Sequence, residues 1–83
     1  MQKILPKDFG LNSKVRLIKY NDHIGIVIDR KSRIIMKDGL RILDQSKKIK
    51  QISNSVIRLY TSAPVCSKTK VFLQNNNILI YRM

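Results

Sequence analysis

Residues 14–29 read KVRLIKYNDHIGIVID, and this stretch decides the fold because its side chains alternate between two faces on either side of a short interruption. A period of two is typical of a β-strand that is buried on one face. Asn21-Asp22 interrupts the alternation with residues that favour tight turns. The stretch therefore predicts a β-hairpin, with isoleucines on the inner face of its second strand.

The pattern changes several times after the hairpin. Residues 30–33 are charged and predict a second turn, which leads into a short third strand over residues 33–36. Asp38 is a candidate N-cap for a helix over residues 39–52, where apolar residues recur at roughly helical spacing. Residues 56–61 (VIRLYT) predict the clearest strand in the second half of the chain.

Residues 62–77 allow two interpretations. Pro64, preceded by Ser62, is a typical helix entry, and the asparagines at 75–77 are an acceptable helix end. This interpretation, which we favour, buries the side chains of Val65, Thr69, Phe72 and Leu73. The alternative makes residues 69–74 a strand that turns at the three asparagines. Both interpretations end in a strand over residues 78–82.

The predicted order is thus β-β-β-α-β-α-β, a small α+β sandwich with two helices packed on one face of a mixed sheet. Residues 1–13 form an N-terminal arm and residues 14–83 a single domain. Val, Ile, Leu and Phe make up 28 of the 83 residues, enough for one modest core. No apolar run is long enough for a membrane span or a secretory signal, so we expect a soluble intracellular protein, in the cytoplasm or an organelle stroma or matrix.

Charge is the strongest functional signal. Seventeen Lys and Arg residues face five Asp and no Glu, a net charge of +12. Residues 30–60 carry nine positive and two negative side chains, a net of +7. Such a surface favours acidic partners, of which nucleic acids are the most abundant, although it also suits a merely solvated face. The candidate phosphate contacts are Arg30, Lys31, Arg33, Lys37, Arg41, Lys47 and Lys48.

Aromatic residues add a second candidate contact. Arg58 and Tyr60 alternate onto one face of their predicted strand, opposite Ile57 and Leu59. Bases of single-stranded nucleic acid stack on Tyr and Arg side chains presented by a sheet. The structural alternative is that each tyrosine lies at the edge of the core with its hydroxyl in water. No motif for sequence-specific readout is present.

The segment from Ser62 to Lys68 predicts a strand, a tight turn and the first turn of a helix. Free amides there make a candidate anion site, to which Ser62, Cys66, Ser67 and Lys68 could contribute. The same environment would stabilise the thiolate of Cys66. The structural alternative is a capped helix with a small buried cysteine.

No other residues suggest chemistry. One Cys and one His exclude an internal disulfide and a conventional zinc site, and His23 is expected to be an exposed turn residue. The five aspartates form no pair suited to acid–base catalysis or metal binding. We therefore expect no catalytic residue, no metal and no cofactor.

The strand–turn–helix–strand unit from Val56 to Tyr81 resembles, in architecture alone, small basic α+β nucleic-acid-binding domains such as the Alba type. In those domains a basic strand and loop lead into a helix whose start faces the nucleic acid. No family motif matches residue by residue, so the resemblance implies no functional positions.

Three hypotheses follow. The first is a non-enzymatic nucleic-acid-binding module, RNA-binding or ribosome-associated rather than DNA-binding, that acts mainly through phosphate contacts. The second is a small accessory or assembly subunit that docks on an acidic protein surface, with Leu79, Tyr81 and Met83 contributing. The third is a thiol- or phosphate-handling enzyme centred on Cys66. A homodimer is compatible with all three, and the Ile-, Lys- and Asn-rich composition suggests an AT-rich genome, as in plastids and some bacteria.

Overall fold

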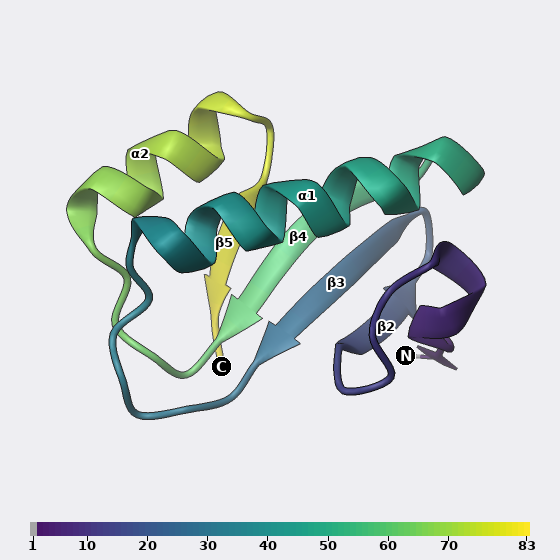
Figure 1. The fold of residues 1–83 in the computed structure, drawn as a ribbon, viewed down its shortest axis with the longest axis horizontal. Helices are drawn as coiled ribbons and strands as arrows, with labels where there is room; N and C mark the ends of the chain where they lie inside the picture. Colours follow the sequence, from purple (N-terminus) through teal and green to yellow (C-terminus); the bar gives the residue numbers. More distant parts are fainter. Residues whose placement is uncertain (1) are drawn as a thin grey trace.

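A computed structural model describes residues 2–83, with the backbone alone for Gln2, and arranges them in two layers (Figure 1). One layer is a five-stranded sheet, and the other contains two α-helices. The strands are β1 (Gln2–Lys3), β2 (Arg16–Tyr20), β3 (His23–Ile28), β4 (Val56–Thr61) and β5 (Leu79–Arg82). The helices are α1 (Met36–Ile52) and α2 (Ser67–Asn75), and the 3-10 turn η1 (Pro6–Phe9) lies in the N-terminal arm.

The strands lie in the sheet in chain order, β1-β2-β3-β4-β5. The β1–β2 and β2–β3 pairs are antiparallel, whereas β3–β4 and β4–β5 are parallel. Each parallel connection passes through a helix. Both connections step the same way along the sheet, so a common right-handed crossover puts α1 and α2 on the same face, as Figure 1 shows. The predicted fold class, a mixed sheet with two helices on one face, is confirmed.

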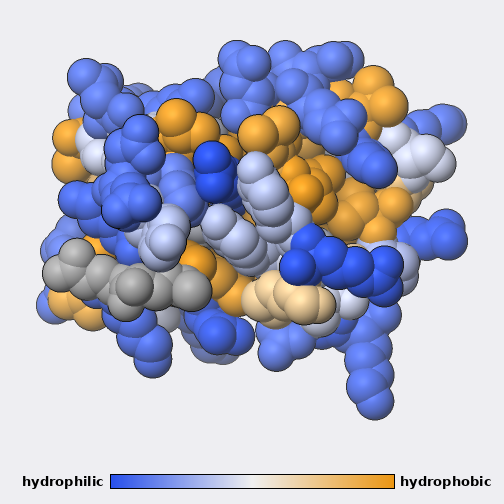
Figure 2. Space-filling view, turned by 180° about the vertical axis from the view of Figure 1, so that it is seen from behind, coloured by the Kyte–Doolittle hydropathy of each residue, from blue (hydrophilic) through white to orange (hydrophobic). Residues whose placement is uncertain are grey.

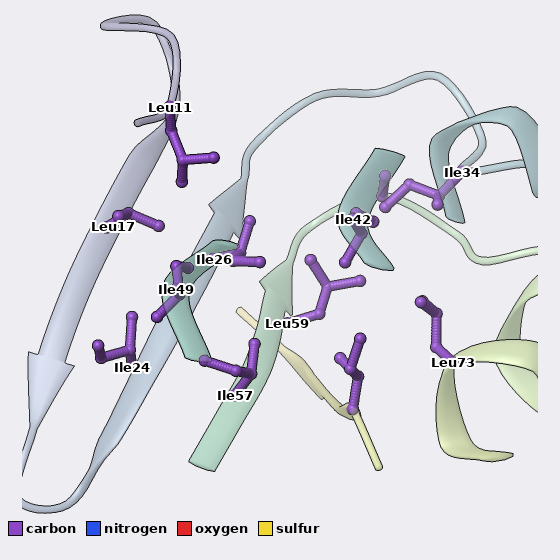
Figure 3. Close-up of a cluster of buried hydrophobic side chains, with 12 residues drawn as sticks. Leu11, Leu17, Ile24, Ile26, Ile34, Ile42, Ile49, Ile57, Leu59 and Leu73 are labelled. Atoms are coloured by element: carbon purple, nitrogen blue, oxygen red, sulfur yellow. The ribbon is translucent and has the colours of Figure 1, made fainter. Parts of the chain in front are cut away.

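The core fills the space between the sheet and the helices (Figure 3). Alternate residues of the two central strands, Ile24 and Ile26 on β3 and Ile57 and Leu59 on β4, are at most 1 % exposed. The helices and loops supply the facing side chains, among them Ile34, Ile42, Ile49 and Leu73. On β2, the next strand of the sheet, Leu17 joins the same core together with Leu11 of the arm. Burial of each such side chain stabilises the fold by about 1.5–3 kcal/mol. The apolar positions of each strand therefore face the helices, and the alternate positions face away from them.

The hairpin and the second helix agree with the sequence. Asn21-Asp22 joins β2 to β3, with Asn21 in the left-handed region at φ 54° and Tyr20 paired with His23. Of the two interpretations of residues 62–77, the helix is correct, although Val65 precedes the helix and forms a β-bridge with Ile34 instead of lying on its buried face. Thr69 and Leu73 lie on its buried face, and the chain leaves it through Asn77 at φ 64°.

Two predicted boundaries are wrong. Residues 33–36 form no strand: Ile34 makes a single parallel bridge with Val65, and Met36 is already the first residue of α1. The N-cap is Ile35, three residues before the predicted Asp38. Asp38 occupies the third helical position, where its carboxylate accepts a hydrogen bond from the Ile35 amide at 2.9 Å. The additional strand of the sheet is β1, inside the predicted arm, whose Met1 lies outside the described residues.

Candidate nucleic-acid interface

The helices leave one face of the sheet uncovered, and we call it the open face (Figure 2). On β4 the buried residues alternate with Arg58 and Tyr60, which therefore lie on the open face as predicted. Strand register assigns the neighbouring positions to the same face. The open face comprises Lys3, Arg16, Ile18, Tyr20, His23, Gly25, Val27, Val56, Arg58, Tyr60, Leu79 and Tyr81, none of which is acidic. Pale side chains of intermediate hydropathy gather near its middle in Figure 2.

Four aromatic rings form a row across the open face, one from each of β2 to β5. The centroids of Tyr20 and His23 are 5.4 Å apart, those of His23 and Tyr60 6.2 Å, and those of Tyr60 and Tyr81 5.5 Å. The outer rings are the accessible ones, with Tyr20 49 % and Tyr81 38 % exposed. The row thus offers aromatic surface at both ends of a largely covered centre.

Gly25 makes the covered centre possible. A Cβ atom at this position would lie 2.6 Å from two carbons of the Tyr60 ring and 2.9 Å from a side-chain carbon of Ile18. Because glycine has no Cβ, the Tyr60 ring lies directly over β3. There its hydroxyl shares a hydrogen bond of 2.9 Å with Nε2 of His23.

His23 differs from the prediction of an exposed turn residue. It is the first residue of β3 and only 4 % exposed, because rings of β2 and β4 lie on both sides of it. Burial, together with the positive charge of Arg58, lowers the pKa of His23, and the carboxylate of Asp22 offsets this only in part. His23 is therefore neutral near pH 7, and it orients Tyr60 rather than adding charge.

Arg58 supplies a fixed positive charge near the centre of the open face. Its guanidinium carbon lies 5.1 Å from the centroid of the Tyr81 ring, a cation–π contact. Its Nε atom is buried and has no hydrogen-bond partner among residues 2–83. No acidic side chain of the open face neutralises this charge.

The basic residues predicted between 30 and 50 lie elsewhere. Lys37, Arg41 and Lys48 are exposed along one side of α1, in the helix layer, since their spacing of four and seven residues repeats the helical period. Lys47 is also exposed but lies on a different side of α1, and Lys31 and Arg33 lie in the loop before it. The predicted nucleic-acid contacts thus do not form one surface: Arg58 and Tyr60 lie on the open face, whereas the other residues lie on α1 or in the loop before it.

Arg30 has a structural contact. Its guanidinium donates to the Asp38 carboxylate at 2.7 Å and to the backbone oxygens of Ser32 and Arg33 at 3.2 Å each. Burial alone would raise the pKa of Asp38, but the hydrogen bonds from Arg30 and Ile35 and the nearby positive charges outweigh it and lower that pKa. Arg30 therefore stabilises the loop and the start of α1.

The predicted anion site is only partly assembled. The Ser62 hydroxyl donates to the Asp29 carboxylate at 2.6 Å, so Ser62 belongs to an acidic contact rather than to an anion site. Cys66 is the N-cap of α2, and Ser67 and Lys68 are exposed in its first turn. Hydrogen bonds from the backbone of Thr69 and Lys68 lower the pKa of the Cys66 thiol, with a smaller contribution from the charge of Arg33. Cys66 is the only cysteine in the chain, and the only histidine, His23, lies at the start of β3.

Other kinds of site are not found in the described part of the chain. No three His, Cys, Asp or Glu side chains come together as a metal site would require. Neither α1 nor α2 has the length and apolar character that crossing a bilayer requires. Comparisons with protein-family models, with curated proteins and with solved structures find no match for this chain, so the resemblance to Alba-type domains carries no further argument.

Sequence reasoning missed the roles of His23 and Gly25. A signal for both was present. A two-residue turn at Asn21-Asp22 places Tyr20 opposite His23, and alternation then assigns Gly25 to the same face as His23. A glycine in the middle of a strand often marks a close approach by another group. What no local pattern contains is the parallel register of β3 and β4, which brings Tyr60 over that glycine.

Proposed function

We propose that this protein is a non-enzymatic module that binds single-stranded nucleic acid, chiefly RNA, on its open face. The observation that carries the proposal is the row of four rings beside the unneutralised Arg58, on a face without acidic residues. Aromatic stacking contributes about 1–3 kcal/mol per base, and every base can stack. RNA is the preferred ligand because its loops and bulges present unstacked bases.

The face offers two kinds of contact to a nucleic acid, of which the rings favour unpaired strands over duplexes. The accessible rings of Tyr20 and Tyr81 can stack only with bases whose faces are free, and a duplex hides those faces. Positive charge at Arg58 and at the exposed Arg16 can neutralise phosphates and release counterions. Binding should therefore combine a salt-sensitive part with a part that depends on the rings.

The test is fluorescence anisotropy with a labelled single strand of about ten nucleotides, as RNA and as DNA, and with the matching duplex. Tyr81 suits the test because it is exposed on an edge strand, so its replacement should leave the fold intact. Tyr81→Ala should weaken single-strand binding by roughly 5- to 150-fold, the equivalent of one lost stacking contact. The control is Tyr81→Phe, which keeps the ring and should bind like the wild type.

Two results would contradict the proposal. One is equal affinity of the wild type and Tyr81→Ala for the single strand. The other is an affinity that does not change between about 50 and about 200 mM salt, because phosphate contacts must release counterions.

A second candidate function rests on the edge of the sheet. β5 is an outermost strand, and Leu79 and Met83 are 46 % and 53 % exposed. An unpaired strand edge with apolar side chains can extend the sheet of a partner protein, which would make this chain an accessory subunit of a larger complex. A stoichiometric protein partner that survives nuclease treatment and is lost with Leu79→Asp would favour this function over nucleic-acid binding.

A further inference from the structure

A groove of about 640 Å³ lies between the N-terminal arm and α1. The arm and the beginning of β2 form one wall, α1 forms the other, and the end of β3 lies between them. Five positively charged residues line it, namely Lys14, Arg16, Arg30, Arg41 and Lys48. No aromatic ring is among its lining residues.

The groove begins where the open face ends. Arg16 and Val27 are paired across β2 and β3 and belong to the open face, and both also line the groove. The junction lies at the end of the hairpin remote from its Asn21-Asp22 turn. From there the groove leads to Arg41 and Lys48 on α1, so it connects the two basic surfaces that the sheet otherwise separates.

The charge of the groove favours an anionic occupant. Its five positive and three negative side chains, the latter being Asp29, Asp38 and Asp44, give a net of +2. Two of the carboxylates are paired with positive groups: Asp38 with Arg30 at 2.7 Å, and Asp44 with Lys48 at 3.4 Å. The third, Asp29, accepts a hydrogen bond from the Ser62 hydroxyl.

Three of the positive side chains are free of such pairing. Within residues 2–83, Lys14, Arg16 and Arg41 form no ion pair with a carboxylate. The Lys48–Asp44 pair is well exposed, so it gives up little when Lys48 turns to another anion.

We infer that the groove is a second segment of the nucleic-acid site, which holds the phosphate backbone of the strand as it leaves the open face past Arg16. This inference rests on the proposed function. The two segments differ in chemistry, because the open face offers rings and the groove offers only charged, polar and aliphatic groups. The groove therefore binds backbone and is indifferent to base identity, and it is filled only by strands too long for the open face alone.

The test compares single strands of about 4 and about 12 nucleotides, lengths that bracket small and large single-strand sites. The wild type should bind the longer strand more tightly. Arg41→Ala should weaken binding of the longer strand about 3- to 10-fold and leave the shorter one unchanged. Its salt slope for the longer strand should fall by about 0.7, as expected for one lost phosphate contact.

The matched control is Lys47→Ala, which removes one positive charge from an exposed position on another side of the same helix, outside the groove. It should affect both lengths alike and only slightly. Asp29→Asn, which removes a negative charge from the groove, should strengthen binding of the longer strand alone.

The outcomes separate the two proposals. If Tyr81→Ala weakens both lengths while Arg41→Ala behaves like Lys47→Ala, the open face binds and the groove inference is overturned. If the wild type binds neither length, the proposed function itself fails. A uniform loss for both lengths in Arg41→Ala also overturns the groove, since the effect is then one of overall charge.

Discussion

Gly25 is the residue on which the arrangement of the open face depends. Its missing Cβ lets the Tyr60 ring lie over β3 and reach His23. Gly25→Ala should displace that ring and lower the free energy of unfolding by about 1–3 kcal/mol, as overpacking usually does. Chemical denaturation measures the change, and the Tyr60→Ala background provides the control. In the Tyr60→Ala background, Gly25→Ala should lower the free energy of unfolding far less than it does in the wild type. An equal loss in both backgrounds would mean that the Tyr60 ring is not the cause.

His23 should give the protein a pH-dependent stability. Its pKa in the folded state lies below the ordinary histidine value of 6.5, because burial and the charge of Arg58 lower it more than Asp22 raises it. The rings of Tyr20 and Tyr60 flank the imidazole. The unfolded chain therefore binds more protons below pH 6.5, so the free energy of unfolding must fall as the pH drops through this window.

Denaturation at about pH 7.5 and about pH 5.5 measures this effect, on either side of the ordinary histidine pKa. His23 is the only histidine in the chain, so no other imidazole contributes. In His23→Gln, the difference between the free energies of unfolding at the two pH values should be smaller than in the wild type. A wild type that is more stable at the lower pH would contradict a lowered pKa.

At the level of elements, Asp38 governs how α1 begins. Its carboxylate binds the Ile35 amide and the Arg30 guanidinium, and its side chain is 15 % exposed. Asp38→Ala should lower the free energy of unfolding by about 1–2 kcal/mol, since it removes the acceptor of the Ile35 amide at the helix start and leaves partly buried donors without a partner. Thermal unfolding measures this change.

Asp44→Ala is the comparison for Asp38→Ala. It breaks the exposed pair with Lys48 on the same helix and should cost about 0.5 kcal/mol or less. Equal losses would show that Asp38 acts merely as a surface charge. The lowered pKa of Asp38 also means that its contribution to stability is fully present above the ordinary aspartate pKa of 3.8 and is lost as the pH falls through the folded pKa.

The elements that the sequence predicts are those with a strong local signal. Alternation identifies β4 and the hairpin, and Pro64 with the terminal asparagines identifies α2. The start of α1 was misplaced because its N-cap is Ile35, which has no side-chain oxygen, while the recognisable Asp38 acts from the third position. β1 has two residues and no pattern of its own, so only its pairing with β2 makes it a strand.

The whole molecule shows why the candidate site was only half predictable. The sequence indicates that Arg58 and Tyr60 share a face, because alternation within a strand is local. It also indicates a basic centre, but composition cannot assign charges to surfaces. The parallel crossover through α1 puts the helical part of that centre on the opposite side of the sheet from Arg58. The aromatic row needs the registers of three strand pairs at once, which depend on packing rather than on any one segment.

A net charge of +12 predicts that the protein binds any polyanion at low salt, so charge and stacking must be separated at the scale of the whole molecule. Heparin offers dense negative charge and no bases, whereas single-stranded RNA offers both. As the salt concentration increases, heparin binding should vanish. For RNA, the affinity extrapolated to about 1 M salt should remain measurable, because base stacking on the rings does not depend on charge. Titrations with both ligands over a salt series measure this. Tyr81→Ala should lower the RNA affinity extrapolated to high salt and leave the heparin affinity unchanged. If Tyr81→Ala weakened the binding of both ligands equally, the binding would be due to charge alone.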